Sequence, residues 1–154
     1  MKNRIHLLVA ATFVAAPGLA TADEHRMRTP PLPSYTQECA SCHVAFAPGL
    51  LSAGSWQRLM ADLPHHFGTD ASVDAATQAA LTAWLTAHAG SGRRVDAAPP
   101  QDRITRSAWF QREHRRITTA VWQRPSIRSV SNCSACHRDA AAGDFDEDAV
   151  AIPR

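Results

Sequence analysis

Two short cysteine motifs, each ending in a histidine, are the clearest chemical signal in the chain. The first reads CASCH (residues 39–43) and the second reads CSACH (residues 133–137). Two thiols three positions apart can each form a thioether with one vinyl group of a haem, while the imidazole that follows reaches the iron. The motifs therefore predict two covalent c-type haems. The predicted attachment residues are Cys39, Cys42, Cys133 and Cys136, and the predicted iron ligands that follow them are His43 and His137.

Zinc binding and disulfide formation are the alternative uses of paired cysteines. Zinc knuckles place their two cysteine pairs roughly 15–20 residues apart, whereas 90 residues lie between Cys42 and Cys133 here. Disulfides are permitted in an exported protein, but they give no reason for the histidine after each pair. With 8 histidines in 154 residues, a histidine behind both pairs is not expected by chance, so haem attachment is favoured.

Haem iron takes a second axial ligand, usually from His or Met. No His, Met or Cys follows His137, so the opposite ligand of the second haem must lie upstream. His114 is predicted for this role because it shares an apolar stripe at i, i+4 and i+7 with Phe110 and Ile117, and because it lies 19 residues before Cys133, far enough for the chain to fold back over the porphyrin. Apart from the two motif histidines, the His and Met residues of the mature chain that could ligate a haem iron are His25, Met27, Met60, His65, His66, His88 and His114.

The opposite ligand of the first haem is not decided by spacing. Met60, His65, His66 and His88 all follow the first motif at usable distances. An ideal helix through this region would keep His66 on its apolar face and turn His65 to the opposite side. Pro64 interrupts that helix and weakens the extrapolation, so the four candidates stay open on this argument.

The first residues have the pattern of a secretory signal peptide. Lys2 and Arg4 precede an apolar run that ends in the cleavage-type sequence Ala20-Thr21-Ala22. The run is shorter than the roughly 20 apolar residues that span a bilayer. We therefore expect residues 1–22 to be removed and the mature chain to be periplasmic, without a membrane span.

The rest of the sequence predicts a mainly α protein in two halves. Apolar periodicity indicates a helix from Ser55 that Pro64 ends or kinks, and a second helix that Ser72 would cap at its start and Gly90 at its end. A third helix is expected from Ser107, with His114 and Ile117 on its apolar stripe. The predicted divisions are an N-terminal haem domain at 23–92, a linker at 93–104 and a C-terminal haem domain at 105–154.

The mature chain carries no net charge, but its charges are unevenly placed. Without Lys2 and Arg4, the 16 basic residues become 14, against 14 acidic ones. Arginines concentrate in residues 93–128 and carboxylates in residues 139–154. The balance makes nucleic acid an unfavourable partner. The arginines could pair with haem propionates, form a solvated basic face, or dock an acidic partner.

Four stretches of the sequence resemble the small dihaem cytochrome c family known as DHC. They read ECASCHVAFAPGLLSAGSWQRLM, HHFGTDASVD, RITRSAWFQREH and NCSACHRDAAAGDFDEDAVAIPR, and the resemblance extends from about residue 32 to residue 154. It implies a class I cytochrome c-like N-terminal helical unit and a less regular C-terminal haem-binding unit. It also implies His66 and His114 as the second axial ligands, so that both haems would be bis-histidine.

The resemblance further implies an electron carrier rather than an enzyme. Its expected partners are a membrane cytochrome b and a soluble, oxygen-binding monohaem cytochrome c, the sphaeroides haem protein. Two alternatives are a dihaem subunit of a periplasmic reductase and a small dihaem peroxidase or oxygen-binding protein with one open haem site. Carbon monoxide binding and copurification with a larger chain would discriminate among these three functions.

Overall fold

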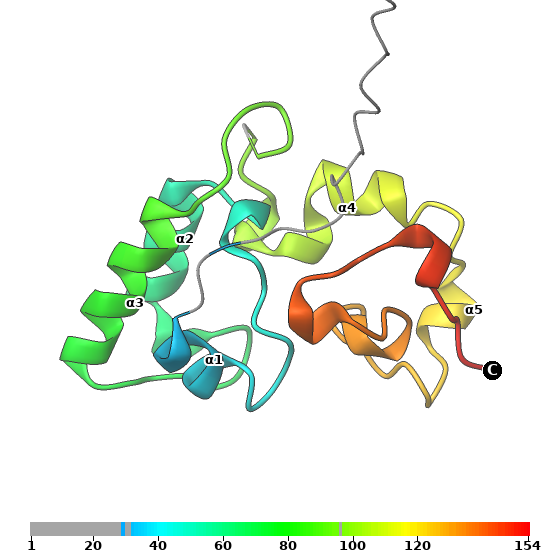
Figure 1. Ribbon diagram of the computed structural model, residues 1–154, viewed down its shortest axis with the longest axis horizontal. Helices are drawn as coiled ribbons and strands as arrows, with labels where there is room; N and C mark the ends of the chain where they lie inside the picture. Colours follow the sequence, from blue (N-terminus) through cyan, green and yellow to red (C-terminus); the bar gives the residue numbers. More distant parts are fainter. Residues whose placement is uncertain (1–28, 30–31, 96) are drawn as a thin grey trace, which may run out of the picture.

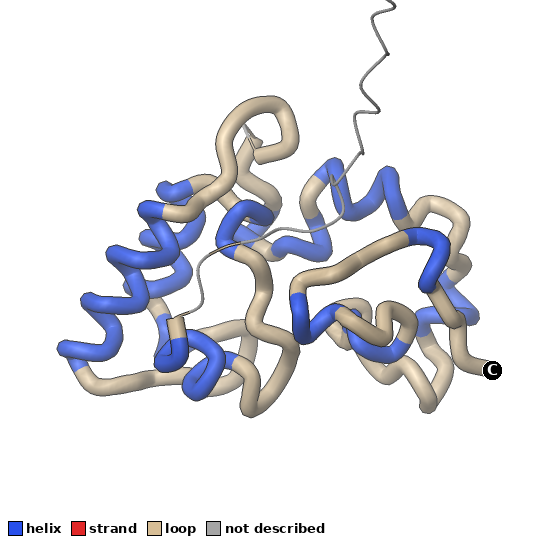
Figure 2. The backbone as a smooth tube through the Cα atoms, in the orientation of Figure 1, coloured by secondary structure: helices blue, strands red, loops and turns tan. Residues whose placement is uncertain are grey.

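The computed structural model describes residues 29, 32–95 and 97–154. Within these residues the regular structure is helical, and extended pairing is limited to two isolated bridges, His66 with Thr69 and His137 with Val150 (Figures 1 and 2). The mainly α fold class is thereby confirmed. The predicted signal peptide, residues 1–22, lies outside the described residues, as do the candidates His25 and Met27.

Three α-helices form the N-terminal unit: α1 (Pro33–Cys39), α2 (Ala53–Ala61) and α3 (Ala75–Ala87). Helices α2 and α3 pack along each other, and α1 crosses the end of the pair (Figure 1). Two 3-10 helices, η1 (Pro48–Leu50) and η2 (Leu63–His65), flank α2. The side chains buried between these elements are Tyr35, Leu51, Trp56, Met60, Leu63, Leu81 and Leu85.

Helix α2 begins and ends where local chemistry requires. The Ser52 hydroxyl accepts a hydrogen bond from the Ser55 N–H and caps the first turn. The helix stops at Ala61, three residues before Pro64, which lacks an N–H and sits in the tighter turn of η2. Pro64 was predicted to end this helix, and the structure confirms it. The chain is thereby redirected immediately before His66.

Helix α3 begins later than predicted. Asp74, not Ser72, is its N-cap, because the Asp74 carboxylate accepts hydrogen bonds from the N–H groups of Ala76 and Thr77. The N–H of Ser72 is instead bonded to the carboxylate of Asp70. Ser72 therefore belongs to the turn that precedes the helix, and the prediction of Ser72 as the cap was wrong.

Gly90 has a packing role rather than the predicted capping role. The C-cap of α3 is His88, with φ −110°, and Gly90 lies two residues beyond it. The Gly90 N–H donates to the Leu51 carbonyl at 2.8 Å. A Cβ at Gly90 would overlap the backbone oxygen of Gly49 and approach Val95 Cγ1 to 3.0 Å. Glycine is required here because two backbone segments meet.

The C-terminal half is built from shorter pieces. Its helices are α4 (Ala108–Glu113) and α5 (Thr119–Trp122), followed by the 3-10 helices η5 (Cys133–Ala135), η6 (Ala140–Ala142) and η7 (Glu147–Ala149). Two further 3-10 helices, η3 (Pro100–Asp102) and η4 (Ile104–Arg106), connect it to the N-terminal unit. The two halves lie side by side (Figure 1). The domain boundaries stay predictions.

Helix α4 starts as predicted but is shorter. The Ser107 hydroxyl accepts the Phe110 N–H and caps the helix. The helix ends at Glu113, so His114 occupies the C-cap and Ile117 lies beyond the helix, contrary to the predicted continuous stripe. After His114 the chain continues in single turns, such as the Ile117 N–H bond to the His114 carbonyl. None of the helices in the described ranges is long and apolar enough to cross a bilayer.

We predict that Gly90→Ala destabilises the protein by about 1–3 kcal/mol, the usual cost of forcing extra atoms into a packed site. Thermal or urea unfolding of the haem-loaded protein measures this. Gly49→Ala is the matched control, since a Cβ at Gly49 meets nothing within 4 Å. Equal stability of the two variants would contradict the close backbone approach at Gly90.

Candidate haem sites

The first motif lies at the end of α1. Cys39 is the last residue of that helix, and Cys42 and His43 follow in the turn beyond it. The His43 ring is fixed by an Nδ1–H hydrogen bond to the carbonyl of Val44, at 2.7 Å. This bond leaves the other ring nitrogen, Nε2, available to a metal.

His66 lies opposite His43 across the first site. The ring centroids are 6.2 Å apart and the ring planes are inclined by 30°. A metal–imidazole nitrogen bond is about 2 Å long and that nitrogen lies roughly 1 Å from the ring centroid, so two imidazoles on opposite sides of one metal have centroids about 6 Å apart. The observed separation fits a shared metal.

The other three candidates for this position are engaged elsewhere. Met60 is 5% exposed and part of the hydrophobic core. His65 is exposed and bonded to the Asp62 carboxylate at 2.7 Å, which raises its pKa above the ordinary value. The His88 ring packs on Trp84, with centroids 5.2 Å apart, whereas the ring that faces His43 is that of His66. The structure therefore separates His66 from the candidates that sequence spacing left open.

A short loop sets the direction of His66. Its carbonyl accepts the Thr69 N–H at 3.1 Å, and the Ala71 N–H returns to the Leu63 carbonyl at 2.9 Å. Phe67 has the left-handed φ of 53°, and its ring lies 4.7 Å from that of His66. A left-handed non-glycine residue costs free energy and persists where surrounding contacts enforce it.

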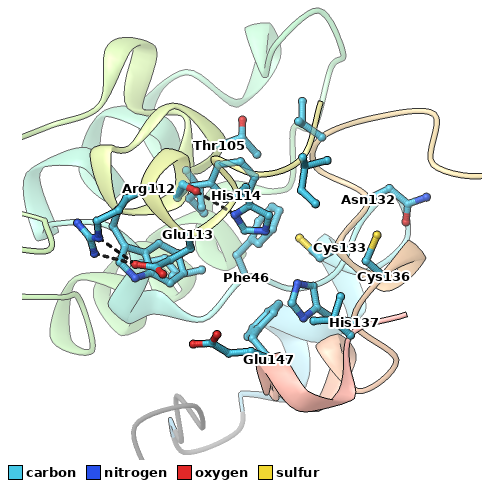
Figure 3. Close-up of a pocket in the computed structure, with 18 of the residues that line it drawn as sticks. Phe46, Thr105, Arg112, Glu113, His114, Asn132, Cys133, Cys136, His137 and Glu147 are labelled. Atoms are coloured by element: carbon cyan, nitrogen blue, oxygen red, sulfur yellow. Dashed lines mark hydrogen bonds and ion pairs between the residues drawn. The ribbon is translucent and has the colours of Figure 1, made fainter. Parts of the chain in front are cut away.

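The second site is a cavity of about 380 Å³, within the roughly 300–1,000 Å³ usual for cofactor sites. It brings together the four residues that the sequence assigned to the second haem (Figure 3). Those four lining residues are His114, Cys133, Cys136 and His137. The apolar remainder of the wall includes Trp109, Phe110, Ile117, Trp122, Val150 and Ile152.

His114 is held rigidly at the end of α4. Its Nδ1–H donates to the Phe110 carbonyl at 2.9 Å, and its ring stacks on the Phe110 ring at 4.0 Å. Trp122 packs on the same imidazole, with centroids 5.8 Å apart. The rings of His114 and His137 are 6.2 Å apart, the same separation as in the first pair, with planes inclined by 71°.

Phe46 belongs to both sites and was not identified from the sequence. Its ring stacks on His43 at 4.8 Å, while the same residue lines the cavity that holds His114 and His137. The buried Tyr35 hydroxyl donates to the Phe46 carbonyl at 2.7 Å and fixes this segment. The second cysteine motif, which lines this cavity, lies about ninety residues after Phe46 in the sequence. Phe46 reaches the cavity only through the tertiary structure, so no local pattern could have revealed the contact.

Comparison with known proteins identifies the family. A family model described as dihaem cytochrome c matches residues 35–145. A dihaem cytochrome c from Shewanella baltica OS155 has a TM-score of 0.69 and 38% identity, covering 79% of this chain and 92% of its own. DHC from Rhodobacter sphaeroides has a TM-score of 0.66 and 39% identity, covering 77% and 100%. A search of curated proteins found no match.

The chain belongs to the dihaem cytochrome c family. Its cofactors are accordingly two covalently attached c-type haems, as predicted. The residues that attach and ligate each haem stay predictions, and the geometry above is the support for them.

Buried polar atoms show how the chain fits these cofactors. Nδ1 of His66 and Nδ1 of His137 are buried without a hydrogen-bond partner among the described residues. Such orphaned atoms are uncommon in folded proteins. Burial lowers the pKa of both imidazoles, which favours the neutral form that binds metals. The chain by itself completes neither site, and the residues present suit haem.

The burial of Cys39 and Cys133 disfavours zinc binding. Burial raises the pKa of the Cys39 thiol and of the Cys133 thiol to about 11 in each case, whereas a zinc ligand must be a thiolate. The four cysteines form no disulfide. The described part of the chain contains no cluster of three or more His, Cys, Asp or Glu side chains that could hold a metal ion.

Replacing the four motif cysteines by serine should leave a largely unfolded chain, because the short helices bury too little apolar surface without the attached macrocycles. Far-UV circular dichroism of the quadruple variant, compared with the haem-loaded wild type, measures the loss of helix. A near-native spectrum would show that the polypeptide folds without its cofactors.

Proposed function

We propose that the protein is a periplasmic electron carrier in which each haem iron is held between two imidazoles. The first iron would be ligated by His43 and His66, and the second by His137 and His114. The predicted thioether residues are Cys39 and Cys42 for the first haem and Cys133 and Cys136 for the second.

The single observation that carries this proposal is the repeated pairing of histidine rings. Two pairs from unrelated segments have the same centroid separation of 6.2 Å. In each pair one member follows a cysteine motif and the other is delivered by a separate element, η2 or α4. One such coincidence could be fortuitous, but two at both predicted haem sites support axial ligation.

The proposed ligand set determines the chemistry. When bound, each haem supplies one-electron exchange between ferrous and ferric iron. With His43 and His66 on the first iron and His137 and His114 on the second, imidazoles would hold each iron from both sides and would leave no position for oxygen or peroxide. Two imidazoles also favour a lower reduction potential than a His/Met pair. These properties support a carrier over the alternative of a small peroxidase or oxygen-binding protein.

The aromatic surroundings would keep each imidazole in place during electron transfer. His114 is enclosed by Phe110 and Trp122, and His43 is stacked on Phe46. Rigid ligands change little between oxidation states, so little reorganisation accompanies the transfer of an electron. Phe46 contacts His43 and lines the second cavity, which supports electron exchange between the two cofactors within one molecule.

The proposed partners are a membrane cytochrome b and a soluble, oxygen-binding monohaem cytochrome c, between which the protein would carry electrons. This part of the proposal rests on the family resemblance and on the secretory pattern of residues 1–22. Stable copurification with a larger catalytic chain would instead favour a reductase subunit.

Carbon monoxide added to the reduced protein should leave the visible spectrum unchanged, because carbon monoxide requires an open axial position. Absorption spectroscopy before and after addition tests this directly. Rapid formation of a carbonyl spectrum at either haem would contradict two filled iron centres.

His114→Ala and His66→Ala should each convert one haem to a high-spin, carbon monoxide-binding form and leave the other unchanged. The methionine variants His114→Met and His66→Met should each raise one midpoint potential by a substantial part of the roughly 0.8 V range that axial ligands set. Paramagnetic resonance and potentiometry report the two effects.

The matched controls are His65→Ala and His88→Ala, which remove neighbouring imidazoles that face other partners. Both controls should retain the wild-type low-spin spectrum. A wild-type spectrum from His66→Ala, or a high-spin signal from His88→Ala, would assign the first haem to a different ligand.

A further inference from the structure

Arg103 differs from the other arginines of residues 93–128. Its Nε is buried and has no hydrogen-bond partner among the described residues. Other guanidinium groups of this segment have partners: Arg106 donates to Gln101, Arg112 pairs with Glu113, and Arg124 donates to the Pro153 carbonyl. Arginine is always protonated in proteins, so Arg103, a half-buried residue, combines a positive charge with a buried donor that lacks a partner.

The adjacent carboxylate does not neutralise this charge. Asp102 forms a two-point ion pair with Arg58, with Nε and a terminal nitrogen at 2.9 and 2.7 Å from its two oxygens. A carboxylate held in this fork–fork geometry is committed to its partner. The Arg58–Asp102 pair also fixes the backbone immediately before Arg103.

The guanidinium of Arg103 is directed towards the first haem site. Its central carbon, Cζ, lies 3.9 Å from the centroid of the Phe67 ring, and Phe67 in turn packs on His66 at 4.7 Å. The contact with Phe67 is a cation–π interaction, which fixes the plane of the guanidinium. The charge therefore lies beside the imidazole assigned to the first iron.

The backbone on both sides of this contact is constrained. Gln101 and Asp102 have left-handed φ values of 60° and 54°, and Phe67 has 53°. Three non-glycine residues in this conformation, placed at the two segments that bring Arg103 and Phe67 together, indicate that tertiary contacts enforce the arrangement. Arg103 is presented from the connecting segment rather than from either haem motif.

We propose that Arg103 binds a propionate carboxylate of the first haem. A haem carries two propionates at one edge, and these are the carboxylates that a c-type haem brings to its protein. The planar guanidinium offers Nε–H and a terminal N–H to one carboxylate in parallel. This inference rests on the proposed assignment of His43 and His66 to the first iron.

The expected consequence is an effect on one potential only. A propionate left without its arginine is a bare negative charge near the iron, and negative charge stabilises ferric over ferrous iron. Arg103→Leu should therefore lower the midpoint potential of the first haem. We expect the ferric-to-ferrous ratio of that haem at a fixed potential to rise by a factor on the order of three to ten, with the second haem unchanged.

Two further variants distinguish the loss of the Arg103–propionate contact from the loss of a positive charge in this region. Arg103→Lys keeps the charge but loses the two-point geometry, so its effect should be intermediate. Arg106→Leu removes one positive charge three residues further along the chain. Arg106 is exposed and bonded to Gln101, so this variant should leave both potentials at wild-type values. His66→Met, which raises the potential of the first haem, identifies which step of the titration belongs to that haem.

Redox-difference infrared spectra of the haem-loaded variants provide a readout independent of potential. The propionate carboxylate bands should shift in Arg103→Leu and remain in Arg106→Leu. Unchanged bands and potentials in Arg103→Leu, or equal shifts in Arg103→Leu and Arg106→Leu, would overturn the proposal. If Arg103→Leu does not accumulate, wild-type bands and potentials in Arg103→Lys would overturn it equally.

The outcome is separable from that of the ligand assignment. Paramagnetic resonance of the wild type reports whether the first iron is low-spin with two imidazoles, whatever Arg103 does. A low-spin wild type with no effect of Arg103→Leu rejects the propionate contact alone. A high-spin first haem in the wild type rejects the ligand pair instead.

Discussion

The fold depends on holding two imidazole rings, taken from segments far apart in the chain, at a fixed separation in each of two places. A cysteine motif can position its own histidine because all its groups lie within five residues. The facing histidine has no such local means. His66 is placed by the end of α2 and the turn at Pro64, and α2 is itself fixed by packing on α3. His114 is placed by the end of α4, where its ring and backbone both bond to Phe110. The helices are therefore best understood as supports for these facing rings.

Sequence alone was sufficient where the chemistry is local. The spacing of the two cysteine motifs predicted the cofactors, and comparison with known proteins confirmed them. The start of α4 at Ser107 and the interruption at Pro64 follow from side-chain capping and from the missing proline N–H. The choice between His65 and His66 was beyond local reasoning, because Pro64 ends the helical period that would have ranked them. His65 and His66 acquire different surroundings only in the folded loop, which the hydrogen bond from the Ala71 N–H to the Leu63 carbonyl closes.

Other features were missed or misjudged. Asp74 rather than Ser72 caps α3, because the Asp74 carboxylate accepts the N–H groups of Ala76 and Thr77 while Ser72 lies in the preceding turn. Gly90 is needed for contact with Gly49 and not for the helix end. Arg103 could be grouped with its neighbouring arginines by composition, but its buried Nε and its position over Phe67 follow from tertiary contacts. Each of these outcomes reflects a competition between equally capable local groups that the three-dimensional arrangement decides.

The position of Phe46 bears on how far the two halves can be treated as interchangeable modules. One phenyl ring stacks on His43 and also forms part of the wall around His114 and His137. In a chimera of this N-terminal half with the C-terminal half of a relative, Phe46 would line a second haem cavity to which it is not matched. Such a graft must be re-fitted at this ring, since a change made for one cofactor is transmitted to the other. At this ring the two halves are therefore not independent modules, despite their different architectures.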